Sequence, residues 1–424
     1  MSDIVKINSK MLKGRVCIPS SKSIAHRVII ASALSGGECR LDNITMNEDI
    51  KATIRCIRSL GAKCSVNIKE KAVKISPKKA VKAKGDMVLD CGESGSTLRF
   101  LLPLALLQDR PVKFIGCGRL MERPLTPYLE IFNKIGIKHE IGDDFIRVKG
   151  HLKAGVYELP GDVSSQFVTG LMLALPLLEG NSKIVISSPL ESKGYVDITI
   201  DVLKSFGISI KNKGYSEFII KGGQKYKPTD YKVEGDYSQA AFFLVAGALG
   251  CDIVCDNLRE NSVQGDKKIL DIIDKLGGKI RKLDDGGICA VRTDVMHGGV
   301  IDARDIPDLV PIIAVLCSFC RGESRIINAG RLRLKESDRL LAISTELKRL
   351  GVNIIEGSDS LKIVGGDLLV PNTVSAWNDH RIVMAIAIGA CRTEGSIEIV
   401  GAEAAVQKSY PEFFEVYKNL TDWI

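Results

Sequence analysis

The sequence predicts an α/β protein of two domains, each built from three copies of one structural unit. Nearly all-apolar helical segments recur about every seventy residues, a β-rich stretch follows each of them, and a second, amphipathic helix then completes the unit. A chain of 424 residues exceeds what one hydrophobic core usually serves. Six buried helices are therefore shared between two domains of ordinary size.

The apolar helices come first in each unit. In chain order they are "HRVIIASALSGG", "TLRFLLPLALLQ", "QFVTGLMLALPLLEG", "QAAFFLVAGALG", "DLVPIIAVLCSFCRG" and "HRIVMAIAIGACRTEG", starting near residues 26, 97, 166, 239, 309 and 380. A helix that is apolar on every side must be buried. Each unit therefore contributes one helix to the centre of its domain.

The second helices end on a repeated signal. Five of the six units contain it, as "SLGAK", "KIGIK", "SFGIS", "KLGGK" and "RLGVN". A glycine after the last helical residue is typical of a left-handed C-terminal cap. These five sites predict a helix end followed at once by a strand.

A polar segment, "GGQKYKPTDYKVEGD", lies just before the fourth unit and predicts a domain boundary. We expect an N-terminal domain over residues 19–231 and a C-terminal domain over 1–18 and 232–424. The opening strand, residues 4–18, is expected to pair with the second domain because the sixth unit is the shortest.

Composition limits the partners. The formal charge of +8 suits anions, but aromatic content of 5% and the lack of a Lys/Arg-rich tract argue against nucleic acid. No segment is long and apolar enough for a membrane span or a signal peptide, so the twelve cysteines predict a reducing cytoplasm. The single C-x-x-C pair, Cys317 and Cys320, lies in an apolar run and is expected to pack in the core rather than bind metal.

The starts of the apolar helices are polar. "IPSSKSIAHRVII" places Lys22, His26 and Arg27 at a helix start, where the helix dipole favours acidic residues. The corresponding starts of the other units are "CGESGSTLR", "GDVSSQF", "EGDYSQA", "DARDIPDLV" and "WNDHR". One such start is an ordinary cap, but six of them predict helix ends that face a common anion site.

The chain resembles the EPSP synthase (5-enolpyruvylshikimate-3-phosphate synthase) family over nearly its whole length. Nine motifs carry the resemblance, in the family's order: "SKSIAHR", "GESGSTLR", "MERPLTP", "GDVSSQF", "SKGYVDIT", "IPDLV", "LRLKESDRL", "NDHR" and "VQKSYPEFF". It implies a two-domain inside-out α/β barrel of six βαβαββ repeats, three per domain, with helices inside and sheets outside. It also implies a monomeric cytoplasmic enzyme without metal or cofactor.

The family's reaction transfers the enolpyruvyl group of phosphoenolpyruvate to the 5-hydroxyl of shikimate 3-phosphate and releases phosphate through a tetrahedral intermediate. The resemblance places it in a cleft between domains that close on the first substrate. It implies that shikimate 3-phosphate is held by Lys22, Ser23, Arg27, Ser164, Ser165, Gln166, Ser192, Tyr195, Asp308, Arg331 and Lys335. Phosphoenolpyruvate would be held by Lys22, Gly95, Arg123, Gln166, Arg339, His380, Arg381 and Lys408.

Two proton movements are needed, one off the hydroxyl and one onto the methylene carbon. The resemblance implies Asp308 and Glu336 as the acid–base pair and Lys22 as a further proton carrier. We assign Asp308 to the hydroxyl and Glu336 to the carbon, although the sequence leaves the reverse assignment open.

Two positions depart from the family pattern. Glu93 adds a negative charge beside the expected phosphoenolpyruvate pocket, where many relatives have Asn. Arg331 replaces an Asn found in some relatives and could reach the shikimate phosphate.

The herbicide glyphosate occupies the phosphoenolpyruvate site of this family. The absence of a methyl at Gly95 is compatible with sensitivity.

Parts of the sequence are similar to those of two other classes of protein. A UDP-N-acetylglucosamine enolpyruvyl transferase would carry a reactive Cys, and Cys117 precedes "GRLMERP", but the rest of that loop signature is missing. A non-catalytic anion-binding module, similar in architecture to RNA phosphate cyclases, would not need the carboxylate pair that this chain has.

Overall fold

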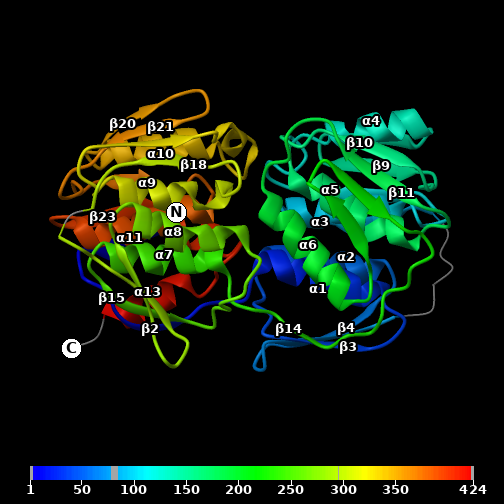
Figure 1. The fold of residues 1–424 in the computed structure, drawn as a ribbon, viewed down its shortest axis with the longest axis horizontal. Coiled ribbons are helices and arrows are strands. Elements are labelled where there is room, and N and C mark those ends of the chain that lie inside the picture. Colours follow the sequence, from blue (N-terminus) through cyan, green and yellow to red (C-terminus); the bar gives the residue numbers. More distant parts are fainter. Residues whose placement is uncertain (1–2, 78–84, 295, 422–424) are drawn as a thin grey trace. The chain divides into compact units, whose positions relative to one another are not determined.

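The computed structural model describes residues 3–77, 85–294 and 296–421. The chain divides into two compact units (Figure 1). The central unit is Lys22–Val233, and the two-segment unit joins Met1–Ser21 to Glu234–Ile424. The structure thus divides the chain after residues 21 and 233, whereas the sequence-based boundaries follow residues 18 and 231.

Five sheets share one topology. In each, the first strand pairs in parallel with the second, the second pairs antiparallel with the fourth, and the third lies at the edge beside the fourth. In the central unit the sheets are β14(Tyr231–Lys232)-β3(Cys39–Asp42)-β5(Ala72–Ser76)-β4(Lys63–Asn67), β6(Met87–Asp90)-β7(Val112–Ile115)-β9(Phe145–Lys149)-β8(Lys138–Ile141), and β10(Val156–Leu159)-β11(Ser182–Ile186)-β13(Glu217–Ile220)-β12(Ile210–Lys213). This order confirms the predicted βαβαββ repeat.

The two-segment unit repeats this arrangement, with a shorter last sheet. Its sheets are β2(Lys13–Cys17)-β15(Asp252–Asp256)-β17(Ile288–Val291)-β16(Lys279–Lys282), β18(Val300–Asp302)-β19(Glu323–Ile327)-β21(Leu361–Val364)-β20(Asn353–Glu356), and β22(Thr373–Ser375)-β23(Ser396–Val400)-β1(Ile4–Asn8). In the last sheet β1 lies antiparallel beside β23, where the other sheets have their fourth strand.

The opening segment forms two strands, so the prediction of one strand over residues 4–18 is wrong. β1 joins the sheet of the sixth repeat, and β2 joins the sheet of the fourth repeat in parallel with β15. Because the two strands belong to different sheets, the chain must turn between them. The first repeat of the central unit is completed in a similar way by β14, about 190 residues after its partner β3.

Six apolar helices form the cores. They begin within four residues of the predicted starts: α1(Lys22–Leu34), α3(Gly95–Ala105), α5(Ser165–Ala174), α7(Tyr237–Ala248), α9(Val310–Cys317) and α11(His380–Gly389). Every residue of α7 is buried. Within each unit the helices pack on one another, α3 on α5 and α7 on both α9 and α11. Each unit has its own hydrophobic core.

The second helices are amphipathic and end where the glycines predict. They are α2(Glu48–Ser59), α4(Thr126–Ile135), α6(Lys193–Ser205), α8(Ile269–Lys275) and α10(Arg339–Arg349). The five glycines that follow, residues 61, 136, 207, 277 and 351, all have positive φ, a conformation that glycine adopts without a Cβ penalty. A strand follows each within three residues.

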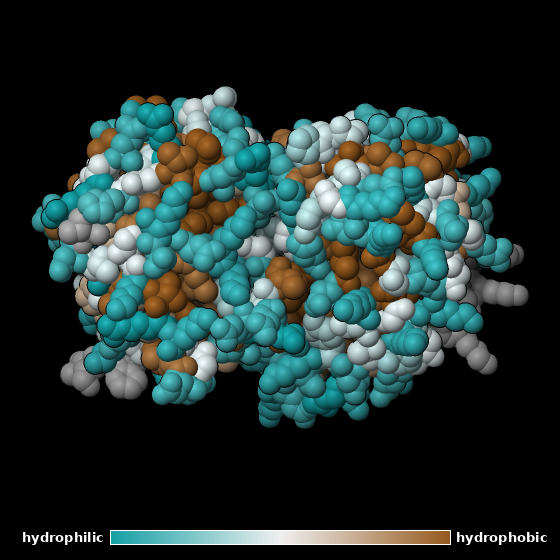
Figure 2. Space-filling view, in the orientation of Figure 1, coloured by the Kyte–Doolittle hydropathy of each residue, from teal (hydrophilic) through white to brown (hydrophobic). Residues whose placement is uncertain are grey.

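Short helices complete the described chain. The 3-10 helices are η1(Leu175–Leu177), η2(Gly265–Lys268), η3(Pro307–Leu309), η4(Gly330–Leu334) and η5(Ala390–Arg392), and the chain ends with α12(Ala402–Val406) and α13(Phe413–Thr421). Along many strands burial alternates, as in Val156–Leu159. Figure 2 shows patches of hydrophobic residues among hydrophilic ones on the visible face of each unit.

The cysteines behave as small core residues. All twelve are free thiols, and Cys317 and Cys320 are buried in and just after α9. Burial raises the pKa of Cys317 to about 12. No helix of the described chain is both long and apolar enough to cross a bilayer.

We expect Phe243→Ala in α7 to destabilise the two-segment unit. The Phe243 ring is fully buried and lies 6.3 Å from the ring of Tyr410 and 6.1 Å from that of Phe413. Removing such a ring leaves a cavity and costs about 3–5 kcal/mol, measurable by denaturant unfolding. Leu368→Ala, at a side chain that is 45% exposed, is the control and should change stability by less than about 0.5 kcal/mol. Equal effects of the two would contradict the packing of α7.

Candidate active site

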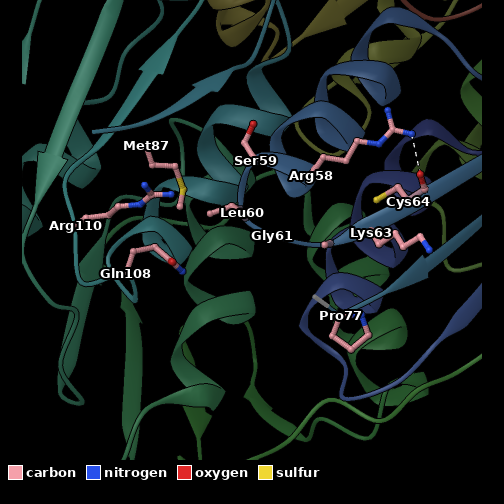
Figure 3. A pocket seen from close by; sticks show the side chains of 11 residues that line it. Arg58, Ser59, Leu60, Gly61, Lys63, Cys64, Pro77, Met87, Gln108 and Arg110 are labelled. Atoms are coloured by element: carbon pink, nitrogen blue, oxygen red, sulfur yellow. Dashed lines mark hydrogen bonds between the residues drawn. The ribbon is translucent and has the colours of Figure 1, made fainter. Parts of the chain in front are cut away.

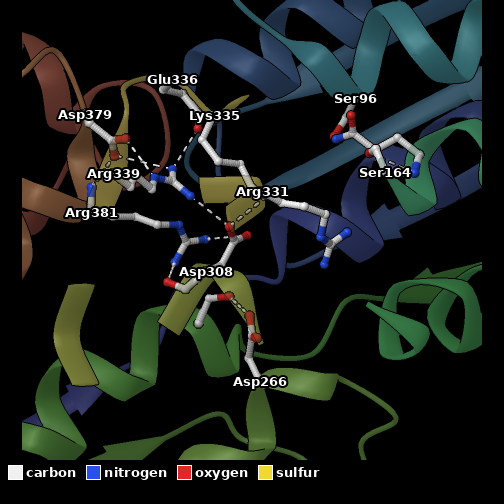
Figure 4. Close-up of polar contacts among 12 residues, drawn as sticks. Ser96, Ser164, Asp266, Asp308, Arg331, Lys335, Glu336, Arg339, Asp379 and Arg381 are labelled. Atoms are coloured by element: carbon white, nitrogen blue, oxygen red, sulfur yellow. Dashed lines mark hydrogen bonds and ion pairs between the residues drawn. The ribbon is translucent and has the colours of Figure 1, made fainter. Parts of the chain in front are cut away.

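In the two-segment unit, the predicted site residues lie where α9, α10 and α11 begin. Asp308 is in η3, directly before α9, and Lys335 and Glu336 follow η4 and precede α10. Arg381 is the second residue of α11, whose N-terminal cap is Asp379. Three apolar or amphipathic helices thus bring these residues together (Figure 4).

Asp308 is surrounded by cations. Its Oδ1 accepts from Nη1 of Arg339 at 2.9 Å and from Nζ of Lys335 at 3.3 Å, and its Oδ2 accepts from Nη2 of Arg381 at 3.2 Å. The Asp308 carbonyl also accepts from Nη1 of Arg381 at 3.0 Å. Three positive charges favour the ionised form of this carboxyl group.

Arg339 is the centre of the cluster and its side chain is only 1% exposed. It donates through Nε to Asp379 at 2.8 Å and through Nη2 to Glu336 at 2.7 Å. Burial alone would lower the pKa of Arg339, but Asp379, Glu336 and Asp308 together raise it above its ordinary value. Arg339 therefore stays charged, and it fixes the position of both predicted catalytic carboxylates.

The two-segment unit contains four further residues that were predicted to bind substrate, namely Arg331, Lys335, His380 and Lys408. Burial lowers the pKa of Lys335, with Asp308 acting in the opposite direction. Arg331 donates to the carbonyl of Arg304 at 2.8 Å, Lys408 donates to that of Asn378 at 2.8 Å, and His380 is 1% exposed. Their roles toward substrate stay predictions.

In the central unit, Lys22 and Arg27 lie in the first two turns of α1. The ammonium of Lys22 pairs with Asp49, in the first turn of α2, at 2.9 Å. Arg27 is 2% exposed and makes four hydrogen bonds, to Thr169, to Thr199 and to the carbonyls of Ser23 and Tyr195. Four of the five guanidinium N–H groups are thus used within the protein, so Arg27 holds α1 against α5 and α6.

Two arginines lie beside the start of α3. A Cβ added at Gly95 would stand 2.9 Å from Nη1 of both Arg99 and Arg123. The Nε of Arg123 is buried and finds no hydrogen-bond partner in the described chain. A helix N-terminus, a missing side chain and an unsatisfied guanidinium N–H are features of an anion site.

Gln166 links the starts of α3 and α5. Its Oε1 accepts from Nη1 of Arg99 at 2.8 Å, and its Nε2 donates to Oγ of Ser96 at 3.0 Å. Ser164 caps α5 and accepts from the backbone N–H of Gln166 at 3.3 Å. These contacts orient the Gln166 amide at the helix start.

Two other serines lie at helix starts. Ser165 is the first residue of α5 and is buried. Ser192 precedes α6 in a left-handed conformation, with φ of 57° and ψ of 44°, and its side chain does not cap the helix. Tyr195, in the first turn of α6, accepts a hydrogen bond from Nη2 of Arg27 through its carbonyl at 3.0 Å.

Several residues around the site were not predicted. Asp379 and Arg99 lie inside the motifs "NDHR" and "GESGSTLR", but the sequence does not show that they hold Arg339 and Gln166. Asp49 and Asp266 lie outside every quoted motif. Their contacts with Lys22 and Ser238 join positions 27 and 28 residues apart, and no local pattern reports such pairs.

The described residues offer no metal cluster, and the cavity drawn in Figure 3 lies away from the predicted site. Among the described residues no group of His, Cys, Asp and Glu could hold a metal ion. Figure 3 shows a cavity of about 660 Å³ in the central unit, near the ends of α2 and α3, which is lined by residues such as Arg58, Lys63 and Arg110 and by no predicted site residue.

Comparisons with known proteins agree over nearly the whole chain. The family model for EPSP synthase (3-phosphoshikimate 1-carboxyvinyltransferase) matches residues 7–417. A 3-phosphoshikimate 1-carboxyvinyltransferase of Clostridium acetobutylicum is 49% identical over 98% of this chain and 97% of its own, and one from Clostridium perfringens is 46% identical over 98% of both.

Solved structures share the fold. The EPSP synthase of Acinetobacter baumannii has a TM-score of 0.80 at 25% identity and covers 99% of this chain and 98% of its own. The enolpyruvyl transferase NikO of Streptomyces tendae has a TM-score of 0.77 at 15% identity, with the same coverage, and at that identity it bears on the fold alone.

We expect Asp379→Asn to destabilise the two-segment unit strongly. The amide can still cap α11, but it removes the buried negative charge that Arg339 contacts at 2.8 Å. Breaking one side of a buried ion pair costs about 3–5 kcal/mol, readable from denaturant unfolding.

The matched control is Asp252→Asn. Asp252 pairs with Lys13 at 3.8 Å, with both side chains more than 60% exposed, and exposed pairs contribute about 0–1 kcal/mol. If Asp379→Asn cost no more than this control, Arg339 would not depend on Asp379.

Proposed function

The chain belongs to the EPSP synthase (3-phosphoshikimate 1-carboxyvinyltransferase) family, and from this premise we propose how its residues carry out the reaction. The protein is an enolpyruvyl transferase of the shikimate pathway, which leads to the aromatic amino acids. It transfers the enolpyruvyl group of phosphoenolpyruvate to the 5-hydroxyl of shikimate 3-phosphate and releases phosphate. The assignment of individual residues is the proposal.

The central unit is proposed to hold the phosphate of shikimate 3-phosphate. Ser164, Ser165 and Ser192 offer hydroxyls at the starts of α5 and α6, where helix dipoles and free N–H groups favour a phosphate. Arg27 supports this arrangement as a positioning residue, because most of its N–H groups bond to the protein. In the two-segment unit, Arg331 and Lys335 are proposed to add positive charge toward the same substrate.

Phosphoenolpyruvate brings a carboxylate and a phosphate, which suit arginine forks. The observation that carries this proposal is the buried, unsatisfied Nε of Arg123 beside Gly95 at the start of α3. Lys22, Arg339, Arg381 and Lys408 are proposed to share the charge of this substrate, with His380 and Gln166 beside it.

The two carboxylates are proposed to move the protons. Asp308 accepts from three cations, which favour its ionised form, so it suits the role of accepting the hydrogen of the 5-hydroxyl. Glu336 is proposed to deliver a proton to the methylene carbon of phosphoenolpyruvate. This proton transfer makes the central carbon of phosphoenolpyruvate electrophilic. The hydroxyl oxygen then adds to that carbon to give the tetrahedral intermediate. In its collapse the bond from this carbon to the phosphate oxygen breaks, phosphate leaves, and one proton of the newly formed methyl group returns to Glu336, which restores the carbon–carbon double bond.

We further propose that the enzyme works as a monomer in the cytoplasm. Twelve free thiols support a reducing compartment.

The first test measures phosphate release from phosphoenolpyruvate with purified protein, offering shikimate 3-phosphate or UDP-N-acetylglucosamine as the acceptor. Release is expected only with shikimate 3-phosphate. Release only with the nucleotide sugar would favour the rival transferase, and tight binding without release would favour the non-catalytic module.

In the same assay, Asp308→Asn and Glu336→Gln are each expected to lower kcat by about 10²- to 10⁴-fold, the usual contribution of a positioned acid or base. Glu323→Gln, at an exposed carboxylate on β19 of the same unit, is the control and should retain wild-type turnover. A variant of either site carboxylate that keeps full kcat would remove that residue from the mechanism.

Gly95→Ala is expected to raise KM for phosphoenolpyruvate much more than KM for shikimate 3-phosphate. The new methyl group would stand 2.9 Å from Nη1 of Arg99 and Arg123 and must displace at least one guanidinium group. Gly36→Ala, where nothing lies within 4 Å of the added Cβ, is the matched control. Equal rises in both KM values would mean that Gly95 does not belong to the phosphoenolpyruvate pocket.

A further inference from the structure

Asp266 is a buried carboxyl group that the reaction as described does not use. It lies in η2 and is 4% exposed. Its Oδ2 accepts a hydrogen bond from the hydroxyl of Ser238, in the first turn of α7. The backbone N–H of Ser238 is in turn held by Asp236, the cap of α7, at 2.8 Å. The Asp266 carboxyl is therefore fixed in place by the start of a rigid helix.

Asp266 in η2 and the proposed base Asp308 in η3 lie on two short helices that both pack against α7. In Figure 4 Asp266 stands below Asp308, while Lys335 and Glu336 lie above it. The charged groups that act on Asp266 from the neighbouring elements are Asp308 in η3, Arg381 in α11 and Asp236 before α7. Arg381 also contacts Asp308, at 3.2 Å, so the two carboxyl groups act on one guanidinium group.

Asp266 has an unusual proton affinity for a carboxyl group. Burial raises its pKa first and most, Asp308 raises it further, and Arg381 and the Ser238 hydroxyl lower it, to a final value of about 7. Asp266 thus changes charge close to neutral pH. Because electrostatic interaction is mutual, each change in the charge of Asp266 alters the proton affinity of Asp308.

We propose that Asp266 is a positioning residue that sets the base strength of Asp308 through its own charge. Ionised Asp266 makes Asp308 a stronger acceptor for the hydroxyl proton, and protonated Asp266 leaves it a weaker one. No proton passes from Asp266 to the substrate; its proton exchanges with water. The inference rests on the role proposed above for Asp308.

The expected signature is a step in the pH profile of kcat. As pH rises through about 7, the wild-type protein should gain about three- to tenfold in kcat, since the added negative charge strengthens the base, and KM for both substrates should change little. Asp266→Asn cannot ionise, so its kcat should stay at the low-pH level without the step.

Folding stability gives an independent measure of the same titration. The pKa of Asp266 is about 7 in the folded protein, against 3.8 for an ordinary aspartate, so folding takes up a proton between these values. The wild-type protein should therefore lose stability as pH rises from about 4 to 7, relative to Asp266→Asn. Melting temperatures of the two proteins across this range measure the difference.

Two further variants separate a charge effect from a structural one. Ser238→Ala removes a hydrogen bond that lowers the pKa of Asp266, so the step in kcat should move to higher pH, a change that a loss of packing would not produce. Asp271→Asn, at an exposed carboxylate in the first turn of α8, should give the wild-type profile.

The experiment measures kcat and both KM values from pH 5.5 to 9 with shikimate 3-phosphate and phosphoenolpyruvate. A wild-type step that is absent in Asp266→Asn and displaced in Ser238→Ala supports the inference. If both proteins turn over and the pH profiles of kcat for wild type and Asp266→Asn are superimposable, the inference is overturned and the proposed function stays intact. Absence of wild-type turnover overturns the proposed function itself.

Discussion

The burial of three apolar helices in each unit is the constraint on which the rest of the structure depends. Each helix leaves backbone N–H groups at its start without partners in the helix. Water cannot satisfy these groups where the start is buried, so side chains must do so, as Ser94, Asp236 and Asp379 do. Polar residues are therefore placed at the helix starts by the needs of folding. The same N–H groups and dipoles attract anions, which is why an anionic substrate suits this architecture.

A second constraint is the cost of burying charge. Arg339 is almost fully buried and is compensated by three carboxylates, Asp308, Glu336 and Asp379. Removing any one of them leaves charge without compensation in a poorly solvated environment. The cluster therefore holds both proposed catalytic carboxylates in fixed positions before substrate arrives, which is the condition under which electrostatic stabilisation of a transition state is most effective.

The exchange of strands ties the repeats to distant parts of the chain. β2 completes the fourth repeat and β14 completes the first, and each strand lies just before the chain passes from one unit to the other. The two-segment unit cannot complete its sheets from one continuous segment, because β1 and β2 come from the start of the chain. Lys22, the first residue of α1, follows β2 closely in the chain, and Asp236, the cap of α7, follows β14 closely. Each passage of the chain from one unit to the other therefore leads directly into the start of an apolar helix.

The amino-acid sequence by itself determined the repeat, the six buried helices, the glycines that end the second helices and, through its resemblance to a family, the reaction. These properties depend on local periodicity, on cap residues and on motifs, which can be read within a few residues of chain. The opening strand was predicted wrongly because its division into β1 and β2 depends on two sheets whose other strands come from residues 252–291 and 373–400. Likewise, only the tertiary structure decided which partners the charged residues have. It pairs Asp379 with Arg339 and Asp49 with Lys22. It also directs the hydrogen bonds of Arg27 to other protein groups and brings the helices of Asp266 and Asp308 together on α7. A charged side chain finds its partner through packing between helices that are far apart in the chain, and the energy of burying it depends on that partner rather than on its neighbours in sequence.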